Sequence, residues 1–249
     1  FSSVMTRTHQ TPTLFLSLPH PCSYLPGRIS SSLFLDPRRK LDSEAYAHFM
    51  RLGFRRSGEF IYRPHCGECR ARVPVRIPVA RFRPSRGQRR VWRRNAGLTV
   101  QARAPVFSAE HFALYARYQA QRHAGGGMDD PDPEKYLHFL AAGRIDTVFH
   151  EMRLDGRLLA VAVVDHLPDS LSAVYTFYDP DEKARGLGIY AVLWQVEEAR
   201  RRGLPYVYLG YWIRESPKMA YKANYAPLET YLDNRWDTLT LESAGVAER

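Results

Sequence analysis

The chain has 249 residues, 45% of them hydrophobic, and can bury one sizeable core or two small ones that share an interface. No run of about 18 apolar residues exists, which excludes a membrane-spanning helix, and the apolar stretch Leu14–Leu18 is too short for a signal peptide. The net charge is +10. The three cysteines, an odd number, argue against a disulfide framework, so we expect a cytoplasmic location.

The first part of the chain, to about residue 103, is expected to form a helix and then strands. Asp42 or Ser43 can cap a helix that Gly53 stops, with apolar positions at Ala45, Tyr46, Phe49 and Met50. A strand is expected at 60–62, followed by a turn at 65–69. Apolar residues then alternate from 73 to 79, which predicts a strand, although Pro74 and Pro78 restrict it to a sheet edge or an irregular course.

The positive charge is concentrated in this part of the chain. Between Arg51 and Arg103 stand 15 arginines and two glutamates, a local balance of +13 that leaves −3 for all other residues. Arginine forks fit phosphate and carboxylate groups, so a dense arginine segment on an otherwise near-neutral protein predicts contact with nucleic acid. The alternative is an ordinary solvated surface.

The second part begins with a predicted helix at 108–122 and a glycine-containing loop at 123–131. A strand meander follows, with an Asp-Gly hairpin signal and a Pro-Asp turn between its strands at 148–154, 158–165 and 171–178.

A loop at 179–188 then opens a helix that ends at Gly203, and a strand is expected at 206–209. Three antiparallel strands, a loop, a helix and a parallel strand resemble the core order of the GCN5-related N-acetyltransferase fold. We therefore expect an α+β fold with this core, preceded by an N-terminal α+β subdomain that contains the cysteines. The expected domains are 5–103 and 104–240.

Seven short motifs are spread along the chain from about His20 to Trp236. They are His20-Pro-Cys-Ser-Tyr-Leu-Pro-Gly27, Gly53-Phe-Arg-Arg-Ser-Gly58, Tyr62-Arg-Pro-His-Cys-Gly-Glu-Cys69, Gln88-Arg-Arg-Val-Trp-Arg-Arg-Asn95, Tyr175-Thr-Phe-Tyr-Asp-Pro180, Gly210-Tyr-Trp-Ile213 and Lys218-Met-Ala-Tyr-Lys222. Together they resemble the arginyl- and leucyl-tRNA-protein transferase family, most closely its bacterial aspartate/glutamate leucyltransferase branch.

The resemblance implies an aminoacyltransferase of the N-degron pathway. Such an enzyme moves leucine from leucyl-tRNA to the N-terminal amine of proteins that begin with Asp or Glu, and thereby marks them for degradation. It implies that domain 5–103 binds the acceptor and the tRNA, and that domain 104–240 carries out aminoacyl transfer.

Cys66 and Cys69 have the spacing of half a zinc site, which His65 or Cys22 would complete. Members of the family commonly carry a further cysteine where this chain has Arg72, and three cysteines cannot build a four-thiolate cluster within one chain. We therefore expect no metal and no other cofactor, and thiols that line the acceptor pocket.

The acceptor must be recognised by its N-terminal ammonium and its acidic side chain, and arginine offers a carboxylate two parallel hydrogen bonds. Arg76, on the strand after the cysteines, is the expected partner of that side chain. The other residues assigned to acceptor binding lie in the motifs: Cys22, Tyr24, Arg63, His65, Cys66 and Cys69. For each residue the alternative is a surface charge or a buried hydrogen bond.

Phosphate contacts are expected to dominate tRNA binding. The expected contacts are the arginines of the basic stretch: Arg86, Arg89, Arg90, Arg93 and Arg94. Trp92 either stacks on an exposed base of the acceptor end or belongs to the core. The loop before the helix that ends at Gly203 resembles a degenerate acyl-CoA pyrophosphate loop. The residues of this loop assigned to the terminal adenosine or its phosphate are Arg185, Gly186 and Gly188.

The aminoacyl ester is already activated, and an α-amine with a pKa of about 7.7–8.0 is partly neutral at working pH. Orientation and oxyanion stabilisation are therefore expected to carry most of the acceleration. Asp179 is assigned to holding or deprotonating the ammonium, with an Asx turn as the alternative. Tyr175 and Tyr178 are assigned to the ester, with core packing as the alternative, and the residues assigned to the oxyanion or the acceptor are Lys218, Tyr221 and Lys222.

Three other functions are compatible with the sequence. The first is arginyl transfer to the same acceptors. The second is acyl-CoA N-acetyl transfer, although the segment 184–188 lacks the usual first basic or amide residue of the acyl-CoA loop. The third is a non-catalytic RNA- or metal-binding module, which explains the arginines but not the strand–loop–helix core.

Overall fold

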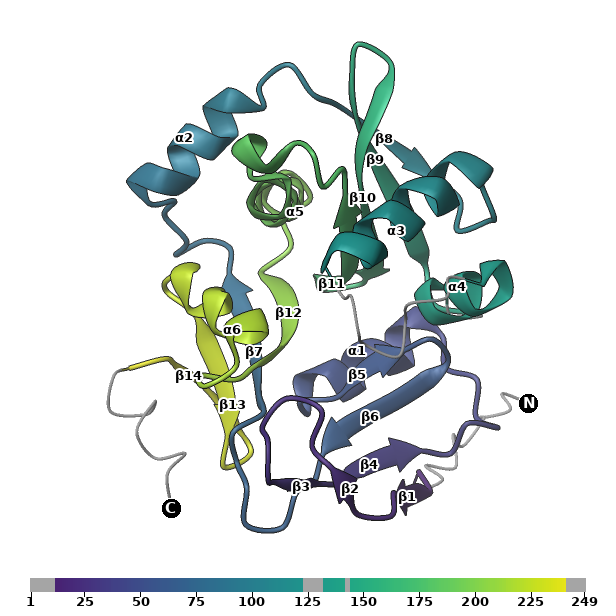
Figure 1. The fold of residues 1–249 in the computed structure, drawn as a ribbon. Helices are drawn as coiled ribbons and strands as arrows, with labels where there is room; N and C mark the ends of the chain where they lie inside the picture. The colour runs from purple at the N-terminus through teal and green to yellow at the C-terminus, as the bar shows by residue number, and fades with distance from the viewer. Residues whose placement is uncertain (1–11, 123–131, 142–143, 241–249) are drawn as a thin grey trace, which may run out of the picture.

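The computed structural model describes residues 12–122, 132–141 and 144–240. Within them the chain forms a mixed α/β fold, with one large sheet covered on both faces and a small sheet below it in the view of Figure 1. The predicted glycine loop, 123–131, lies outside the described residues. Within the described ranges, we find no helix that is both long enough and apolar enough to cross a bilayer.

The large sheet has the strand order β14-β13-β7-β12-β11-β10-β9-β8 in the described residues. The strands are β7 (Val73–Pro78), β8 (Thr99–Arg103), β9 (Thr147–Leu154), β10 (Arg157–Leu167), β11 (Ser170–Tyr178), β12 (Tyr206–Trp212), β13 (Glu229–Leu232) and β14 (Arg235–Thr238). Neighbours run antiparallel, except that β11 and β12 are parallel. The predicted meander and the parallel strand after it are confirmed.

Helices cover both faces of this sheet because side chains alternate along its central strand. The even-numbered residues from Ala160 to Val164 of β10 pack toward α5, whereas Val161 and Val163 pack toward α3 and α4. The helices are α1 (Ser43–Arg51), α2 (Arg86–Arg94), α3 (Ala109–Arg122), α4 (Pro133–Leu140), α5 (Leu187–Arg201) and α6 (Pro217–Ala220), with 3₁₀ turns η1 (Lys183–Arg185) and η2 (Tyr221–Asn224). The helices predicted before Gly53, at 108–122 and before Gly203 are confirmed.

The small sheet has the order β1-β4-β6-β5, and α1 packs between it and the large sheet. Its strands are β1 (Leu14–Leu16), β4 (Ser32–Leu35), β5 (Arg55–Ser57) and β6 (Phe60–Pro64), while β2 (His20–Pro21) pairs with β3 (Ile29–Ser30). Asp42 caps α1 by accepting a hydrogen bond from the Ala45 N–H at 2.9 Å, as predicted. Tyr46 and Met50 are buried in a cluster that includes Tyr208 of the large sheet.

β7 is internal, so the prediction of an edge position is wrong and the irregular course is what the structure shows. β13 pairs only with Val75 and Arg76 of β7, which leaves Pro74 and Pro78 outside that ladder. The register with β12 also shifts between Tyr208 and Gly210. Because β7 and β8 both belong to the large sheet, the expected boundary after residue 103 does not separate the two sheets, and the division into two domains stays a prediction.

A buried ion pair joins the two sheets. Arg56 of β5 donates from Nε to Asp165 Oδ2 at 2.7 Å and from Nη2 to Asp165 Oδ1 at 2.6 Å, and the two side chains are only 1% and 0% exposed. Arg56 Nη2 also contacts the Leu140 carbonyl at 2.9 Å and Thr147 Oγ1 at 3.1 Å. The cost of burying two charges is offset only because both are fully hydrogen-bonded.

Replacing Arg56 alone should destabilise the fold strongly. In Arg56→Met the Asp165 carboxylate stays buried without its partner, which lowers the free energy of unfolding by about 3–5 kcal/mol in urea denaturation at pH 7. The matched control is Arg38→Met, because the pair of Arg38 with Asp36 leaves the arginine 83% exposed and is worth at most about 1 kcal/mol. Equal losses in the two variants would contradict the role of the buried pair.

Candidate functional site

The parallel strands β11 and β12 are joined only at their starts. Residues 170–172 of β11 pair with residues 206–208 of β12. Beyond them β11 runs on to Tyr178 and β12 to Trp212, each held only by its other neighbour. The strands therefore separate toward their carboxyl ends, where α/β sheets commonly bind ligands. We call the segments 173–178 and 209–212 the strand opening.

On the β11 side, Asp179 is held by two arginines. Its carboxylate accepts from Arg117 Nη2 of α3 at 2.5 Å and from Arg157 Nη2 of β10 at 2.6 Å, and from the Asp181 N–H at 3.1 Å. Burial works toward a higher pKa of this carboxyl, but the bonds with Arg157, Asp181 and Arg117 outweigh it and lower the pKa. The Asx turn is thus present, and an ionised, doubly paired carboxylate is a weak base.

The two tyrosines assigned to the ester pack with the aromatic residues of α3 and α4. The Tyr175 ring lies 5.3 Å from that of Phe139, and the Tyr178 ring lies 4.8 Å from that of Tyr118. Tyr178 also contacts the start of α5, where a Cβ on Gly188 would lie 3.2 Å from its Cε1 atom. Tyr178 is the one of the two that meets the predicted loop, while their role toward the ester stays a prediction.

The loop before α5 is tied to α2. Gly186 adopts φ +65°, a conformation that favours glycine, and a Cβ there would lie 3.2 Å from Val91 of α2. The Arg185 carbonyl accepts from Asn95 Nδ2 at 2.8 Å, while the Arg185 side chain donates to Glu182 at 3.0 Å. Arg185 is therefore already engaged by a carboxylate, which weakens its assignment to a phosphate.

On the β12 side, three cations surround Tyr211. The guanidinium carbons of Arg55 and Arg72 lie over its ring, 5.6 and 5.4 Å from the centroid, and Lys222 Nζ donates to its carbonyl at 2.5 Å. The Arg72 guanidinium also lies 5.5 Å from the centre of the Tyr24 ring. We call Arg55, Arg72, Lys222, Tyr24 and Tyr211 the Tyr211 cluster.

Lys222 is the buried member of its predicted set, with 5% of its surface exposed. Burial, and then the nearby charge of Arg55, lower the pKa of Lys222 to about 7. Lys218 and Tyr221 are exposed on the neighbouring turns. The structure therefore brings Lys222 to the β12 side of the strand opening and leaves the other two at the surface.

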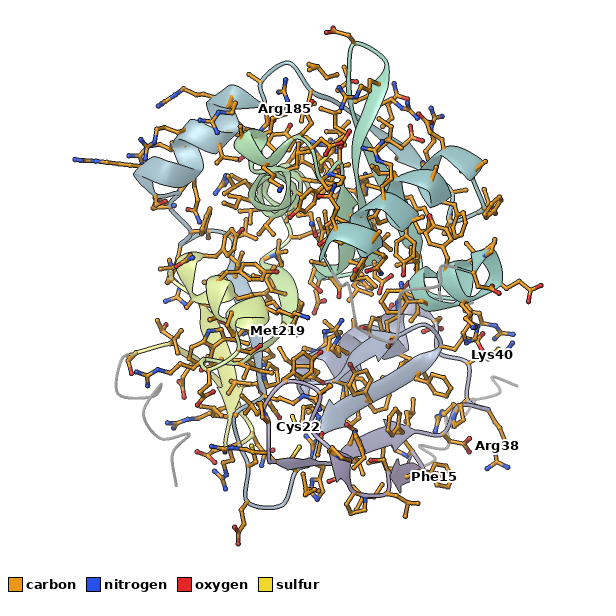
Figure 2. All side chains as sticks on the ribbon, in the orientation of Figure 1. Phe15, Cys22, Arg38, Lys40, Arg185 and Met219 are labelled. Atoms are coloured by element: carbon orange, nitrogen blue, oxygen red, sulfur yellow. The ribbon has the colours of Figure 1, made fainter. Side chains whose placement is uncertain are left out.

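Two of the cysteines lie near this cluster. Cys22 and Cys69, like Tyr24 and Met219 of α6, pack against a small core formed by Leu25, Ala71 and Ile213, and Figure 2 labels Cys22 and Met219. Cys69 Sγ accepts from Arg28 Nη1 at 3.5 Å, and Cys66 Sγ donates to the Ser31 carbonyl at 3.4 Å. No group of three or more His, Cys, Asp or Glu in the described residues is placed to hold a metal ion.

Arg76, the residue assigned to the acceptor side chain, lies on β7 after the cysteines and pairs with a carboxylate of the protein itself. Its Nε donates to Glu229 Oε2 at 2.7 Å, and its guanidinium carbon lies 3.6 Å from the centroid of the Tyr206 ring and 4.3 Å from that of Trp236. A buried guanidinium that a carboxylate of the protein itself already binds is a poor partner for an acceptor. Arg76 instead joins β7 to β13.

Arg63 and His65 also point elsewhere. Arg63 Nη1 donates to the Leu52 carbonyl at 3.2 Å, and its guanidinium lies over Phe54, so this side chain covers the end of α1. The His65 side chain is exposed, and its carbonyl accepts a hydrogen bond from the Ser31 hydroxyl. Of the residues assigned to the acceptor, the structure gathers Cys22, Tyr24 and Cys69 at the Tyr211 cluster.

The basic stretch is a helix, α2, on the outer side of α5 (Figure 1). Ser85 and Gln88 form a capping box at its start. All five predicted arginines are exposed. Trp92 is 37% exposed, and its ring packs at a tilt against that of Tyr190, with the ring centroids 5.3 Å apart. A groove of about 290 Å³ follows the contact between the helices, lined by Phe82, Pro84, Arg89, Trp92, Arg93, Leu193, Val196, Glu197 and Arg200.

Two family profiles cover most of the chain. The profile described as arginine-tRNA-protein transferase, N terminus, matches residues 20–90, and the corresponding C-terminus profile matches residues 110–232. The chain belongs to this family. Its relatives include an aspartate/glutamate leucyltransferase of Chromobacterium violaceum, 52% identical over 90% of this chain and 93% of that protein, and one of Pseudomonas entomophila, 53% identical over 90% and 96%. The protein is accordingly an enzyme that transfers aminoacyl groups.

Similarity to solved structures is much weaker. FemX is 10% identical with a TM-score of 0.46, covering 83% of this chain and 81% of that one. The GCN5-related glucosamine N-acetyltransferase region of a fungal multi-domain β-N-acetylglucosaminidase is 14% identical with a TM-score of 0.41, covering 75% and 21%. Similarity of this size identifies neither a substrate nor a reaction.

Two strand residues of the Tyr211 cluster, Arg55 and Tyr211, were not predicted as site residues. Arg55 lies within the Gly53–Gly58 motif and Tyr211 within the Gly210–Ile213 motif, and both motifs were quoted without a role for these residues. The alternation of side chains along β5 could have identified Arg55, because neighbouring residues of a strand point to opposite faces. With Arg56 buried against Asp165, Arg55 must point the other way.

The lowered pKa of Lys222 predicts a pH dependence of stability. Between pH 7 and 10.5 the unfolded chain keeps a proton that the folded chain loses, so this lysine makes stability rise with pH in that window by up to about 1.4 kcal/mol per unit. In Lys222→Met this contribution disappears. From pH 7 to 9 the free energy of unfolding of the wild type, measured in urea, should therefore rise by about 2 kcal/mol relative to that of the variant. If the free energies of unfolding of the two proteins change in parallel with pH, the lowered pKa of Lys222 is contradicted.

The arginines of α2 predict a salt dependence of tRNA binding. Replacing Arg89, Arg90, Arg93 and Arg94 by alanine removes four phosphate partners and should reduce the slope of log K against log salt by about 3. The control replaces four exposed cations outside α2, namely Arg38, Lys40, Arg70 and Arg235. Figure 2 labels Arg38 and Lys40 far from Arg185, which adjoins α2. Equal slopes for both quadruple variants would show that α2 is only solvated surface.

Proposed function

We propose that this protein transfers leucine from leucyl-tRNA to the N-terminal amine of proteins that begin with Asp or Glu. The observation that carries the proposal is the 52% identity, over nine-tenths of the chain, with relatives named aspartate/glutamate leucyltransferase. The resulting product is an N-degron, and the cytoplasm, where charged tRNA is made, is the proposed place of the reaction. No further cofactor is required by this chemistry.

We propose a GCN5-related acyltransferase core around the strand opening, with the N-terminal part supplying the acceptor side. The order of β9, β10, β11, α5 and β12, with β11 and β12 parallel and diverging, supports this assignment. The arginine face of α2 receives phosphates of the tRNA, and the groove of about 290 Å³ beside Trp92 offers an aromatic ring for an unstacked base. The terminal aminoacyl group then enters the strand opening past the start of α5.

The reaction exchanges an ester for an amide. The acceptor nitrogen bonds to the leucyl carbonyl carbon, the bond from that carbon to the terminal ribose oxygen breaks, and this oxygen takes up the proton that the amine gives up. A free α-amine with a pKa of about 7.7–8.0 is partly neutral at pH 7.5, so placement of the two reactants supplies most of the acceleration.

The residues divide into those that hold the site and those that meet substrate. Asp179, already bound by Arg117 and Arg157, holds the loop that leads to α5. Tyr178 faces the start of α5. The hydroxyl of Tyr178 is assigned to the developing oxyanion, since it is the phenol of β11 that adjoins Gly188.

A label-transfer assay tests the donor and the reaction class together. The enzyme is incubated with a peptide that begins with Asp and, in separate reactions, with radiolabelled leucyl-tRNA, arginyl-tRNA or acetyl-CoA. Label should move only from leucyl-tRNA, and an N-acetylated peptide should be inert because it lacks the nucleophile. Transfer of arginine would identify the other donor of the family, and transfer of acetyl groups would replace the proposed reaction by the acetyltransferase alternative.

A further inference from the structure

The Tyr211 cluster carries positive charge that the protein itself does not neutralise. Elsewhere the buried arginines have carboxylate partners, as Arg56 has Asp165 and Arg76 has Glu229. Around Tyr211, by contrast, no carboxylate among the described residues lies within ion-pair distance of Arg55, Arg72 or Lys222, although all three are partly or fully buried.

Such an arrangement is unfavourable unless an anion completes it. Charges removed from water need a partner or hydrogen bonds in return. Arg72 donates to the Ser30 hydroxyl at 3.2 Å, but its buried Nε has no hydrogen-bond partner in the described part of the chain. The nearby Arg55 also disfavours the charged form of Lys222 and lowers its pKa, an effect that a bound anion would reverse. The cluster is therefore built for a ligand of negative charge.

The backbone of β12 makes room for this arrangement. Gly210 adopts φ +76°, and a Cβ at this position would lie only 2.8 Å from Arg55 Nη1. Any other residue here would push the guanidinium away and strain the backbone. The register shift of β12 against β7 falls at the same place, between Tyr208 and Gly210.

We propose that the Tyr211 cluster binds the side-chain carboxylate of the first residue of the acceptor. This assignment rests on the proposed function, because that function requires an acidic first residue. Arg55 and Arg72 supply the guanidinium groups, which suit a carboxylate, and the Tyr24 and Tyr211 rings limit the space around it.

The place of the cluster favours the acceptor over the tRNA as the source of the anion. In Asp and Glu the side-chain carboxylate is separated from the α-amine by only two or three carbon atoms, so its binding site must adjoin the reacting centre. Tyr211 lies on β12 in the strand opening, where the proposed function puts the reacting centre. The exposed arginines of α2, which suit phosphates, lie beyond α5 (Figure 1).

The test compares peptides that differ only in their first residue, Asp or Asn, by kcat/KM with leucyl-tRNA. The wild type should prefer Asp by about 100-fold or more, because an unpaired buried donor rejects the neutral analogue. In Arg55→Met and Arg72→Met the preference should fall to below about tenfold, because activity toward the Asp peptide falls more than activity toward the Asn peptide. The matched control is Arg70→Met, an exposed arginine two positions from Arg72 that pairs with Asp233 at the surface and should keep the preference.

A second variant removes no charge. Gly210→Ala should reduce the Asp preference as Arg55→Met does, since it displaces the Arg55 guanidinium while leaving the composition of the cluster intact. Thermal unfolding of each variant separates this effect from loss of the fold, and Arg55→Lys, which keeps the charge but not the planar fork, should retain part of the preference.

Two further measurements make the outcomes decisive. If Arg55→Met keeps the Asp preference but weakens binding of uncharged tRNA, the cluster serves a phosphate and the proposal is overturned. Titration calorimetry with the two peptides and no tRNA gives a readout that does not need transfer: the wild type should bind the Asp peptide more tightly, and Arg55→Met should not. A wild type that moves no leucine but shows this binding difference would overturn the proposed function and leave the carboxylate site standing; equal binding of both peptides by the wild type would overturn the site.

Discussion

The buried pair of Arg56 and Asp165 fixes the geometry on which the Tyr211 cluster depends. It ties β5 of the small sheet to β10 at the centre of the large one, with Leu140 and Thr147 completing the hydrogen bonds. Since successive side chains of a strand point to opposite faces, locking Arg56 inward also directs Arg55 toward Tyr211. A structural ion pair thus positions a neighbouring cation that has no carboxylate partner among the described residues.

Arginine occurs in three different environments in this chain. The burial and the partners of each arginine indicate its role more clearly than the sequence motif in which it lies. Arg56 and Arg76 are buried with carboxylates and hold strands together. The arginines of α2 are exposed on a short capped helix, where they suit a polyanion. Arg55 and Arg72 are half-buried around one aromatic ring and suit a small carboxylate. The excess charge of the first hundred residues is therefore divided between arginines that hold the fold together and arginines that we propose bind the tRNA or the acceptor.

Local patterns predicted the second half of the chain well, because alternation, an Asp-Gly turn and helical periodicity are all short-range signals. The strands β9 to β12 and α5 follow from them. The helix α2 was readable from its capping box, Ser85 with Gln88, but was treated only as a basic stretch. The pairing of Arg76 with Glu229 could not be predicted from the sequence, because the two residues lie 153 positions apart. The internal position of β7 likewise depends on β13, which arrives late in the chain.

The short ladder between β11 and β12 also bears on how such an enzyme can change its donor. Only three residue pairs of backbone connect the two strands, while β10 and β7 hold each of them from the outside. The width of the opening is consequently set by side chains on its two walls rather than by main-chain pairing. Substitutions there can enlarge or narrow the opening without interrupting the sheet. Under the proposed entry of the aminoacyl group at this opening, a change of donor would need only side-chain substitutions on its walls, which leave the main-chain hydrogen bonds of the sheet in place.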